Sequence, residues 1–251
     1  MARIYTKPGD KKPRLDKQSI LDFFEKRAQK AADLGPTRAV IYQDKSLDLA
    51  ERRDQAEKAL LLPKLKLKGD SRVLDAGCGT GRWAEVVIPR CSSYVGVDVS
   101  PGLVEVAKQR FSTAPNAQFH VCAVDAITPD GEGMDLPFSQ ILSFGVFIYL
   151  NDDEITHALN GYLSVAGATA RILFREPIAV SERLTLLEHF SDDMNQQYNA
   201  IYRTENELQE LMQPTLQKHG FHQVAEGDVY SDNTLNNRVE TKQKWFLWEK
   251  E

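Results

Sequence analysis

A glycine-rich loop that follows an apolar stretch holds the residues best suited to bind a ligand. Gly77, Gly79 and Gly81 come directly after the segment Val73-Leu74-Asp75-Ala76. Glycines permit a tight turn and let a ligand approach the backbone closely. The spacing G-x-G-x-G differs from the G-x-G-x-x-G of loops that bind dinucleotides. We therefore expect a ligand site at the end of a buried strand, with Asp75 beside it.

The charge of Asp75 indicates which ligand this loop accepts. A pyrophosphate would bring negative charge onto the loop, where the carboxylate would repel it. S-adenosylmethionine instead carries an ammonium and a sulfonium group, which a carboxylate attracts. We expect Asp75 to bind the amino group directly or through water. A second role, as a cap on the backbone N–H groups of the loop, is compatible with this one.

Two further acids stand at the ends of the next two expected strands. Asp98 ends residues 94–98, where an acid about 20 positions after the loop binds two ribose hydroxyls in nucleoside-binding sheets. Capping is the alternative for Asp98, although Ser100 can already cap the next helix. Asp125, at the end of residues 118–124, can accept a hydrogen bond from the adenine amine, and Ala126 offers a backbone N–H to the ring. A turn cap stays open for Asp125.

The surrounding sequence alternates short apolar strands with helical segments, which predicts βαβ units and a mostly parallel sheet. Parallel strands end at one edge of a sheet, so the three acids should meet at a single crevice. A capping box at residues 204–207 begins a later helix, and residues 223–230 and 242–248 predict an antiparallel hairpin. The expected strands of the first part are residues 72–75, 94–98, 118–124, 141–147 and 170–174.

Helical patterns precede this sheet. One helix should end at Gly35-Pro36, and another should run over residues 46–62 and end at Pro63. The length of 251 residues suits a single domain. We divide it into an N-terminal helical cap (residues 1–68), a cofactor-binding core (69–175), a cap insertion (176–203) and a C-terminal helix with a strand hairpin (204–251).

These motifs together resemble those of the class I S-adenosylmethionine-dependent methyltransferases, of the type that acts on small molecules. The resemblance is carried by VLDAGCGTG (residues 73–81), VGVDVS (95–100), CAVDAI (122–127) and ILSFGVFIYL (141–150). It implies a doubly wound, seven-stranded α/β sheet of order 3-2-1-4-5-7-6 with strand 7 antiparallel. To this sheet we add the N-terminal helices and a helical cap insertion, which we expect from the sequence itself. The family often has an acid at the start of the fourth strand, where this chain has Gln140.

The resemblance extends the set of cofactor-binding residues beyond the three acids. Cys78 and Val99 belong to its first two motifs, and Phe144 matches a position on the methionine side, or is plain core. Arg53 would meet the cofactor's carboxylate, or is an ordinary exposed arginine. Tyr42 would fold over the cofactor as part of an N-terminal lid. The product of transfer would be S-adenosylhomocysteine.

The acceptor site is expected over the same sheet edge, beneath the N-terminal helices and residues 176–203. This segment is long for a crossover and contains two arginines, two tyrosines and a histidine. Glu176 or His189 could be a general base, although a histidine is more often structural. Packing on the sheet, or a dimer contact, is the alternative for the segment. The expected acceptor contacts are Tyr149, Arg175, Tyr198, Tyr202 and Arg203.

Composition bears on partners and surroundings. The net charge of −5 argues against a nucleic-acid partner, and no apolar run is long enough to cross a bilayer. Three scattered cysteines predict neither a disulfide framework nor a metal site, which fits the cytoplasm. We expect a monomer or homodimer that methylates an O or N atom of a small polar acceptor, such as a sugar or natural-product intermediate. The alternatives are an RNA or protein methyltransferase, or a protein that binds the cofactor without methylating.

Overall fold

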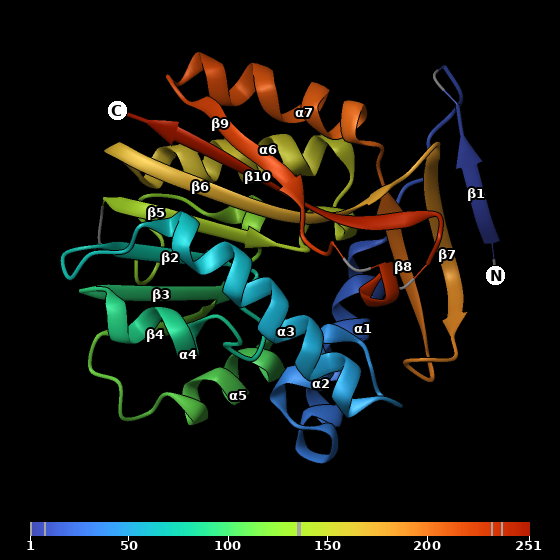
Figure 1. Ribbon diagram of the computed structural model, residues 1–251, viewed down its shortest axis with the longest axis horizontal. Coiled ribbons are helices and arrows are strands. Elements are labelled where there is room, and N and C mark those ends of the chain that lie inside the picture. Colours follow the sequence, from blue (N-terminus) through green and yellow to red (C-terminus); the bar gives the residue numbers. More distant parts are fainter. Residues whose placement is uncertain (1, 8, 135–136, 232, 237) are drawn as a thin grey trace.

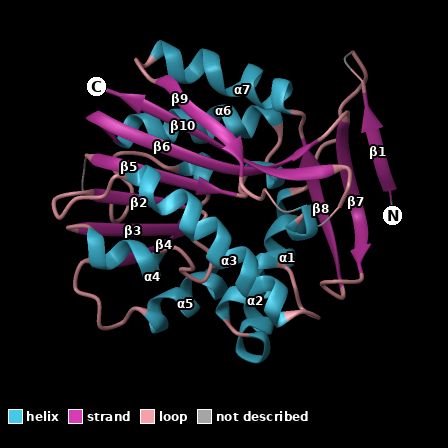
Figure 2. Cartoon of the chain, viewed as in Figure 1, coloured by secondary structure: helices cyan, strands magenta, loops and turns pink. Residues whose placement is uncertain are grey.

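The central sheet is the element on which the rest of the molecule is built (Figure 1). The structure, a computed structural model, describes residues 2–7, 9–134, 137–231, 233–236 and 238–251 (Figure 1). Within these residues, seven strands form the central sheet and three antiparallel strands form a second, smaller sheet (Figure 2). Across the central sheet lie β4 (Ala117–Val121), β3 (Ser93–Asp98), β2 (Arg72–Ala76), β5 (Phe138–Phe144), β6 (Ala166–Ala179), β10 (Thr241–Lys250) and β9 (His222–Asp228).

The strand order confirms the sequence prediction. Numbered along the chain, the seven strands lie in the order 3-2-1-4-5-7-6. β4, β3, β2, β5 and β6 pair in parallel, whereas β10 is antiparallel to both of its neighbours. The carboxyl ends of the parallel strands point toward the small sheet and the N-terminal helices (Figure 1).

Helices cover both faces of the sheet because successive residues of each strand point to opposite sides. Leu74 packs in one buried cluster with Tyr162, whereas its neighbour Val73 packs in another with Leu61. No helix in the described part of the chain is long and apolar enough to cross a membrane. The α-helices are α1 (Lys17–Leu34), α2 (Pro36–Ile41), α3 (Leu47–Leu61), α4 (Ala84–Val87), α5 (Pro101–Arg110), α6 (Asp152–Val165) and α7 (Glu205–Lys218); the 3-10 helices are η1 (Leu62–Leu65), η2 (Ile88–Arg90), η3 (Val124–Ala126), η4 (Phe147–Tyr149) and η5 (Asn233–Leu235).

Helix ends follow the local sequence signals. Thr204 and Glu207 form the predicted capping box of α7, since each side chain accepts a hydrogen bond from the other's backbone N–H. Gly35, with a φ of 81°, ends α1, and Pro63 lies in η1 just past the end of α3. Two predicted strands are too long: η3 follows β4, and Gly145, with a φ of 72°, ends β5 before η4.

The cap insertion is not helical, so this part of the prediction is wrong. Residues 176–203 contain the end of β6 and the antiparallel strands β7 (Arg183–Ser191) and β8 (Gln196–Tyr202). β1 (Ala2–Thr6), in a segment predicted as helical cap, pairs with β7. The register shifts between Leu186 and His189, where Glu188 has a φ of 49°. This irregularity interrupts the two-residue alternation that identifies a strand in a sequence.

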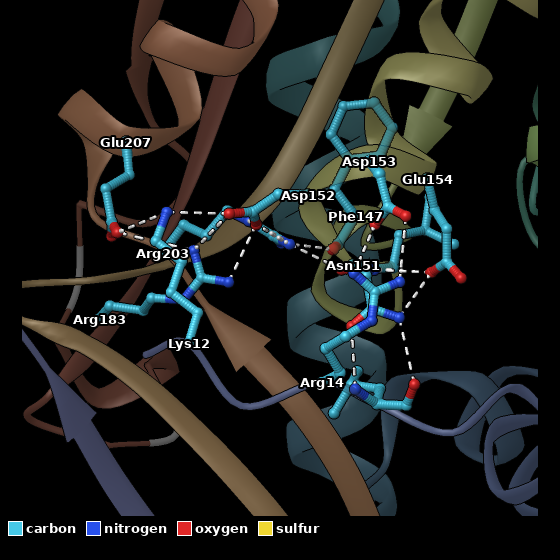
Figure 3. Close-up of polar contacts among 12 residues, drawn as sticks. Lys12, Arg14, Phe147, Asn151, Asp152, Asp153, Glu154, Arg183, Arg203 and Glu207 are labelled. Atoms are coloured by element: carbon cyan, nitrogen blue, oxygen red, sulfur yellow. Dashed lines mark hydrogen bonds and ion pairs between the residues drawn. The ribbon is translucent and has the colours of Figure 1, made fainter. Parts of the chain in front are cut away.

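A cluster of ion pairs fastens the small sheet to the central domain (Figure 3). The Asp152 carboxylate, at the start of α6, accepts hydrogen bonds from Arg183 Nη2 at 2.9 Å and Arg203 Nε at 2.8 Å. Arg203 also donates to the carbonyls of Phe147 and Leu150, at 2.8 and 2.7 Å. Both guanidinium groups are almost fully buried, so this one carboxylate compensates much of their charge.

We predict that Asp152→Ala lowers the free energy of unfolding by about 3 kcal/mol or more, because it leaves two buried cations without their shared acid. Urea denaturation measures this loss. Asp153→Ala is the matched control, since Asp153 also lies in the first turn of α6 but pairs with Arg14 at the surface. Equal, small losses in the two variants would contradict the role given to Asp152.

Candidate functional site

The glycine loop lies at the carboxyl end of β2 and is held against β3. The backbone N–H groups of Gly77 and Cys78 both donate to the Val97 carbonyl, at 2.8 and 2.9 Å. Gly77 and Gly79 have φ values of 84° and 53°, which L side chains rarely adopt. A Cβ at Gly77 would lie 2.4 Å from Val146 Cγ2. The loop therefore needs glycine both for its conformation and for its close packing.

Asp98 lies beside this loop at the end of β3 and is 7% exposed. Its Oδ2 accepts a hydrogen bond from the Gly79 N–H, and its Oδ1 accepts one from the Ser100 N–H, both at 2.9 Å. Burial raises the pKa of Asp98 to about 6, against the effect of these two amides. The capping role and the predicted ribose role are compatible, because each carboxylate oxygen can accept a second hydrogen bond.

Asp75 lies one strand away and is 3% exposed. The Tyr94 hydroxyl donates to its Oδ2 at 2.5 Å. Burial raises the pKa of Asp75 to about 6. In the described part of the chain, no lysine or arginine forms an ion pair with Asp75 or Asp98. The loop is thus bordered by two buried carboxyl groups whose negative charge no ion pair balances.

Asp125 differs from the other two acids because it forms an ion pair with a lysine. Lys17, in the first turn of α1, places its Nζ 2.6 Å from Asp125 Oδ2 and 3.4 Å from Glu154 Oε1. This pair links α1 to the carboxyl end of the sheet. Asp125 remains a candidate for the adenine end, with Lys17 as a partner that the sequence analysis missed.

A first cavity of about 170 Å³ opens among these groups. The rest of the wall includes residues of α1, the cations Arg82 and Arg175, and Trp83 and Phe144, whose rings meet edge to face at 4.8 Å. Gly81 packs against Phe111 instead, Ala126 lies in η3, and Arg53 lines another cavity. The predicted cofactor residues that line the first cavity are Tyr42, Asp75, Gly77, Cys78, Gly79, Asp98, Val99, Asp125 and Phe144.

The donor set of this cavity fits S-adenosylmethionine. Asp75 would hold the ammonium group, Asp98 the two hydroxyls of the ribose and Asp125 the adenine. The two unpaired carboxylates suit a cation and disfavour a pyrophosphate. The glycine backbone at residues 77–79 leaves room that side chains would fill.

A second cavity of about 120 Å³ adjoins the first. Tyr42, Phe144, Gly145, Tyr149 and Arg175 line both. The far wall comes from α3, from the β7–β8 hairpin and from the segment before β10, and it carries Arg53, Asp193, Tyr198, Tyr202, Tyr230 and Arg238. The predicted acceptor residues Tyr149, Arg175, Tyr198 and Tyr202 all line this second cavity, whereas Tyr230 and Arg238 were missed.

Two phenols stand on the shared wall. Burial raises the pKa of Tyr42 to about 12 and that of Tyr149 well above its usual value. Both therefore keep their protons at neutral pH and can donate hydrogen bonds. The Tyr149 ring also packs against Phe24 of α1, at 4.9 Å between centroids.

A buried ion pair positions Arg175 on the same wall. Glu57, which is 2% exposed, lies 2.9 Å from Arg175 Nε and 2.5 Å from Arg82 Nη2. Burial alone would raise the pKa of Glu57, but the two arginines outweigh it and hold the pKa at about 2. Neither Glu57 nor Arg82 was recognised in the sequence. The position of Arg82 directly after the glycine loop was the signal that could have identified it.

Three predicted residues lie away from both cavities. Glu176 Oε1 accepts hydrogen bonds from the Val146 and Phe147 N–H groups, at 2.9 and 3.1 Å, so its carboxylate holds the backbone after β5. His189 lies on β7, where its ring packs on Tyr198 at 5.7 Å. Arg203 belongs to the Asp152 cluster. The described geometry supports neither Glu176 nor His189 as a base, nor Arg203 as an acceptor contact.

Comparison with known proteins identifies related sequences for the core. Residues 73–166 match the model of a family described as a methyltransferase domain. The chain is 35% identical over 74 residues to a malonyl-[acyl-carrier protein] O-methyltransferase 1 of Ilyobacter polytropus, which is 29% of this chain and 27% of that protein. The chain spans between 23% and 37% of the length of the curated relatives that it matches.

Solved structures match over nearly the whole chain at low identity. A phosphoethanolamine N-methyltransferase 1 of Haemonchus contortus, in complex with phosphoethanolamine and S-adenosylhomocysteine, superposes with a TM-score of 0.67 at 15% identity, over 94% of this chain and 50% of that one. A [4+2]-cyclase superposes with a TM-score of 0.63 at 14% identity, over 93% of this chain and 95% of that one. At these identities the likeness shows the fold alone.

We predict that the affinity for S-adenosylhomocysteine falls as the pH is lowered from about 7 to about 5, by up to about tenfold per pH unit for each carboxylate that must be ionised. The sign follows from the raised pKa values of about 6 for Asp75 and Asp98. Protonation removes the charge with which Asp75 attracts the ligand's ammonium group, and it makes Asp98 a weaker acceptor for the ribose hydroxyls. Isothermal titration across this range measures the effect. Asp98→Asn should flatten the dependence, and an affinity that does not change with pH would refute the assignment.

Proposed function

We propose that this chain is a class I S-adenosylmethionine-dependent methyltransferase that transfers the methyl group to an oxygen or nitrogen atom of a small polar acceptor. The observation that carries the proposal is the pair of joined cavities. The first has two buried carboxylates without ion-pair partners beside a glycine loop, and the second has tyrosines and arginines. The small volume of the second cavity favours a small molecule, such as a sugar or natural-product intermediate, over a nucleic acid or a protein.

The chain's own residues mainly bind and orient. When bound, S-adenosylmethionine supplies a methyl group that its sulfonium already activates for displacement. Asp75, Asp98 and the glycine loop would hold it, while Tyr42 and Tyr149 on the shared wall would direct hydrogen bonds at the acceptor. Orientation of two reactants supplies about 7–11 kcal/mol of a barrier in favourable cases. α1 and the aromatic wall exclude water from the junction between the cavities.

The second cavity offers no effective general base, among its described lining residues, to remove a proton from the acceptor. Tyr42 and Tyr149 hold their protons at neutral pH, and Glu57, with a pKa of about 2, is a poor base. Asp193 is the remaining carboxylate in the described lining of the second cavity, and it is exposed. The arrangement therefore favours an acceptor atom that reacts without a strong base.

A second candidate function is binding of S-adenosylmethionine without methyl transfer, and one observation favours testing it. The fold is shared with a [4+2]-cyclase, so the fold alone does not imply methyl transfer. The direct assay incubates the chain with S-adenosylmethionine labelled in the methyl group and with panels of hydroxyl, amine and carboxylate compounds. We expect label in a small acceptor. Affinity for S-adenosylhomocysteine with no methylated product from any class would favour the non-methylating function.

We predict that Asp98→Ala weakens S-adenosylhomocysteine binding by about 1.5–3 kcal/mol, the scale for hydrogen bonds to a charged group. Isothermal titration of folded variants gives this value directly. The matched control is Asp33→Ala, an exposed aspartate near the end of α1. Equal affinity in the wild type and in both variants would remove the ribose-binding role of Asp98. A thermal shift with NAD instead of S-adenosylhomocysteine would overturn the cofactor assignment altogether.

A further inference from the structure

Among the buried arginines of the described chain, Arg53 is the one that forms no ion pair with a carboxylate. It is 4% exposed, and its Nε donates to the Leu235 carbonyl at 2.7 Å. Among the described residues, its two terminal nitrogens have no hydrogen-bond or ion-pair partner. Four other arginines are as deeply buried, and each forms an ion pair with a carboxylate; they are Arg27 with Asp44, Arg82 with Glu57, and Arg183 and Arg203 with Asp152.

Arg238 also forms no ion pair within the described residues, and it lines the same cavity as Arg53. Its Nη1 is buried without a hydrogen-bond partner. Its charge lies over the Tyr198 ring, 5.7 Å from the centroid. Leu235, whose carbonyl accepts the Arg53 hydrogen bond, lies three positions before Arg238 in the sequence.

The charges around this cavity do not balance. Arg53, Arg175 and Arg238 line it, and the lining acids are Glu57 and Asp193. Glu57 is already engaged by Arg175 and Arg82. Asp193 acts on Arg53 through space, but it is exposed and forms no ion pair with any described arginine of the cavity. A buried cation without a counter-ion is costly, and a bound anion would remove that cost.

We infer that the methyl acceptor carries a carboxylate or phosphate group, and that Arg53 and Arg238 bind this group in the second cavity. The inference rests on the proposed function, because it names the chemical class of that function's acceptor. A guanidinium offers paired N–H donors that match the two oxygens of such an anion. The hydroxyls of Tyr198 and Tyr202, 3.4 Å apart on the same wall, can donate to a remaining oxygen.

The first cavity favours a positively charged group, whereas the second favours an anion, and this difference directs the cofactor and the acceptor to separate sites. Asp75 and Asp98 attract a cation there, whereas Arg53 and Arg238 attract an anion in the adjoining cavity. An acidic acceptor would therefore be repelled from the cofactor site and drawn to its own. Charge complementarity of this kind orients a small ligand as well as holding it.

The test titrates anions into protein saturated with S-adenosylhomocysteine, at constant ionic strength. The probes are succinate and glycerol phosphate, with succinamide and glycerol as uncharged counterparts. We expect at least one anion to bind and neither counterpart to bind. Binding of succinate alone assigns a carboxylate, and binding of glycerol phosphate alone assigns a phosphate.

Variants locate the site. Arg238→Gln should weaken the anion about tenfold or more, and Arg53→Lys should weaken it less, because it keeps the charge but loses the fork of donors. Arg90→Gln is the control, since Arg90 is an exposed arginine that lines neither cavity and donates to the Val86 carbonyl, and it should leave the affinity unchanged. Arg238 is only half-buried, so its variant tests the site even if the Arg53 variant fails to fold.

Three results would overturn the inference: no binding of either anion, equal binding of the uncharged counterparts, or wild-type affinity in Arg238→Gln. The saturation step separates these failures from failure of the proposed function. If S-adenosylhomocysteine binds and the anions do not, only this inference is lost. If S-adenosylhomocysteine itself does not bind, the proposed function is lost.

Discussion

Two carboxyl groups, Asp75 and Asp98, are buried where β2 and β3 end, and neither forms an ion pair within the described part of the chain. Burial raises the pKa of each to about 6, so folding keeps them at a cost that a bound cation would relieve. The neighbouring structure depends on this arrangement. Asp98 accepts two backbone N–H groups and thereby shapes the glycine loop, and the parallel strands bring both acids to one sheet edge.

The two cavities carry opposite charge across one shared wall. The first is bordered by the two acids and the second by Arg53 and Arg238, with Tyr42, Tyr149 and Arg175 between them. Glu57 fixes Arg175 at this boundary. The small sheet forms part of the second cavity, and the Asp152 cluster fastens that sheet to the start of α6 (Figure 3). Residues that never touch a ligand thus set the position of those that can.

Sequence reasoning succeeded where local rules determine the structure. The glycine loop and the capping box at Thr204 follow from spacing and turn chemistry, whereas the strand order was implied by the resemblance to the class I methyltransferases. It failed where distant segments meet. β7 pairs with β8 across a bulge and with β1 from the N-terminal segment, so no local period identified these strands. Arg203 was expected to touch the acceptor, but it meets Asp152, 51 residues away. Arg53 was expected at the cofactor, but the packing of α3 places it in the adjoining cavity.

The central claim is that Asp75 and Asp98 bind the cofactor as carboxylates, Asp75 through its ammonium group and Asp98 through its ribose hydroxyls. Carbon NMR of the aspartate carboxyl groups, assigned with Asp75→Asn and Asp98→Asn, follows their titration with and without S-adenosylhomocysteine. We predict that both groups titrate near pH 6 in the free protein and that the bound ligand moves both pKa values down toward the usual range of aspartate. Two aspartates that titrate at their usual pKa in the free protein and do not respond to the ligand would contradict the account.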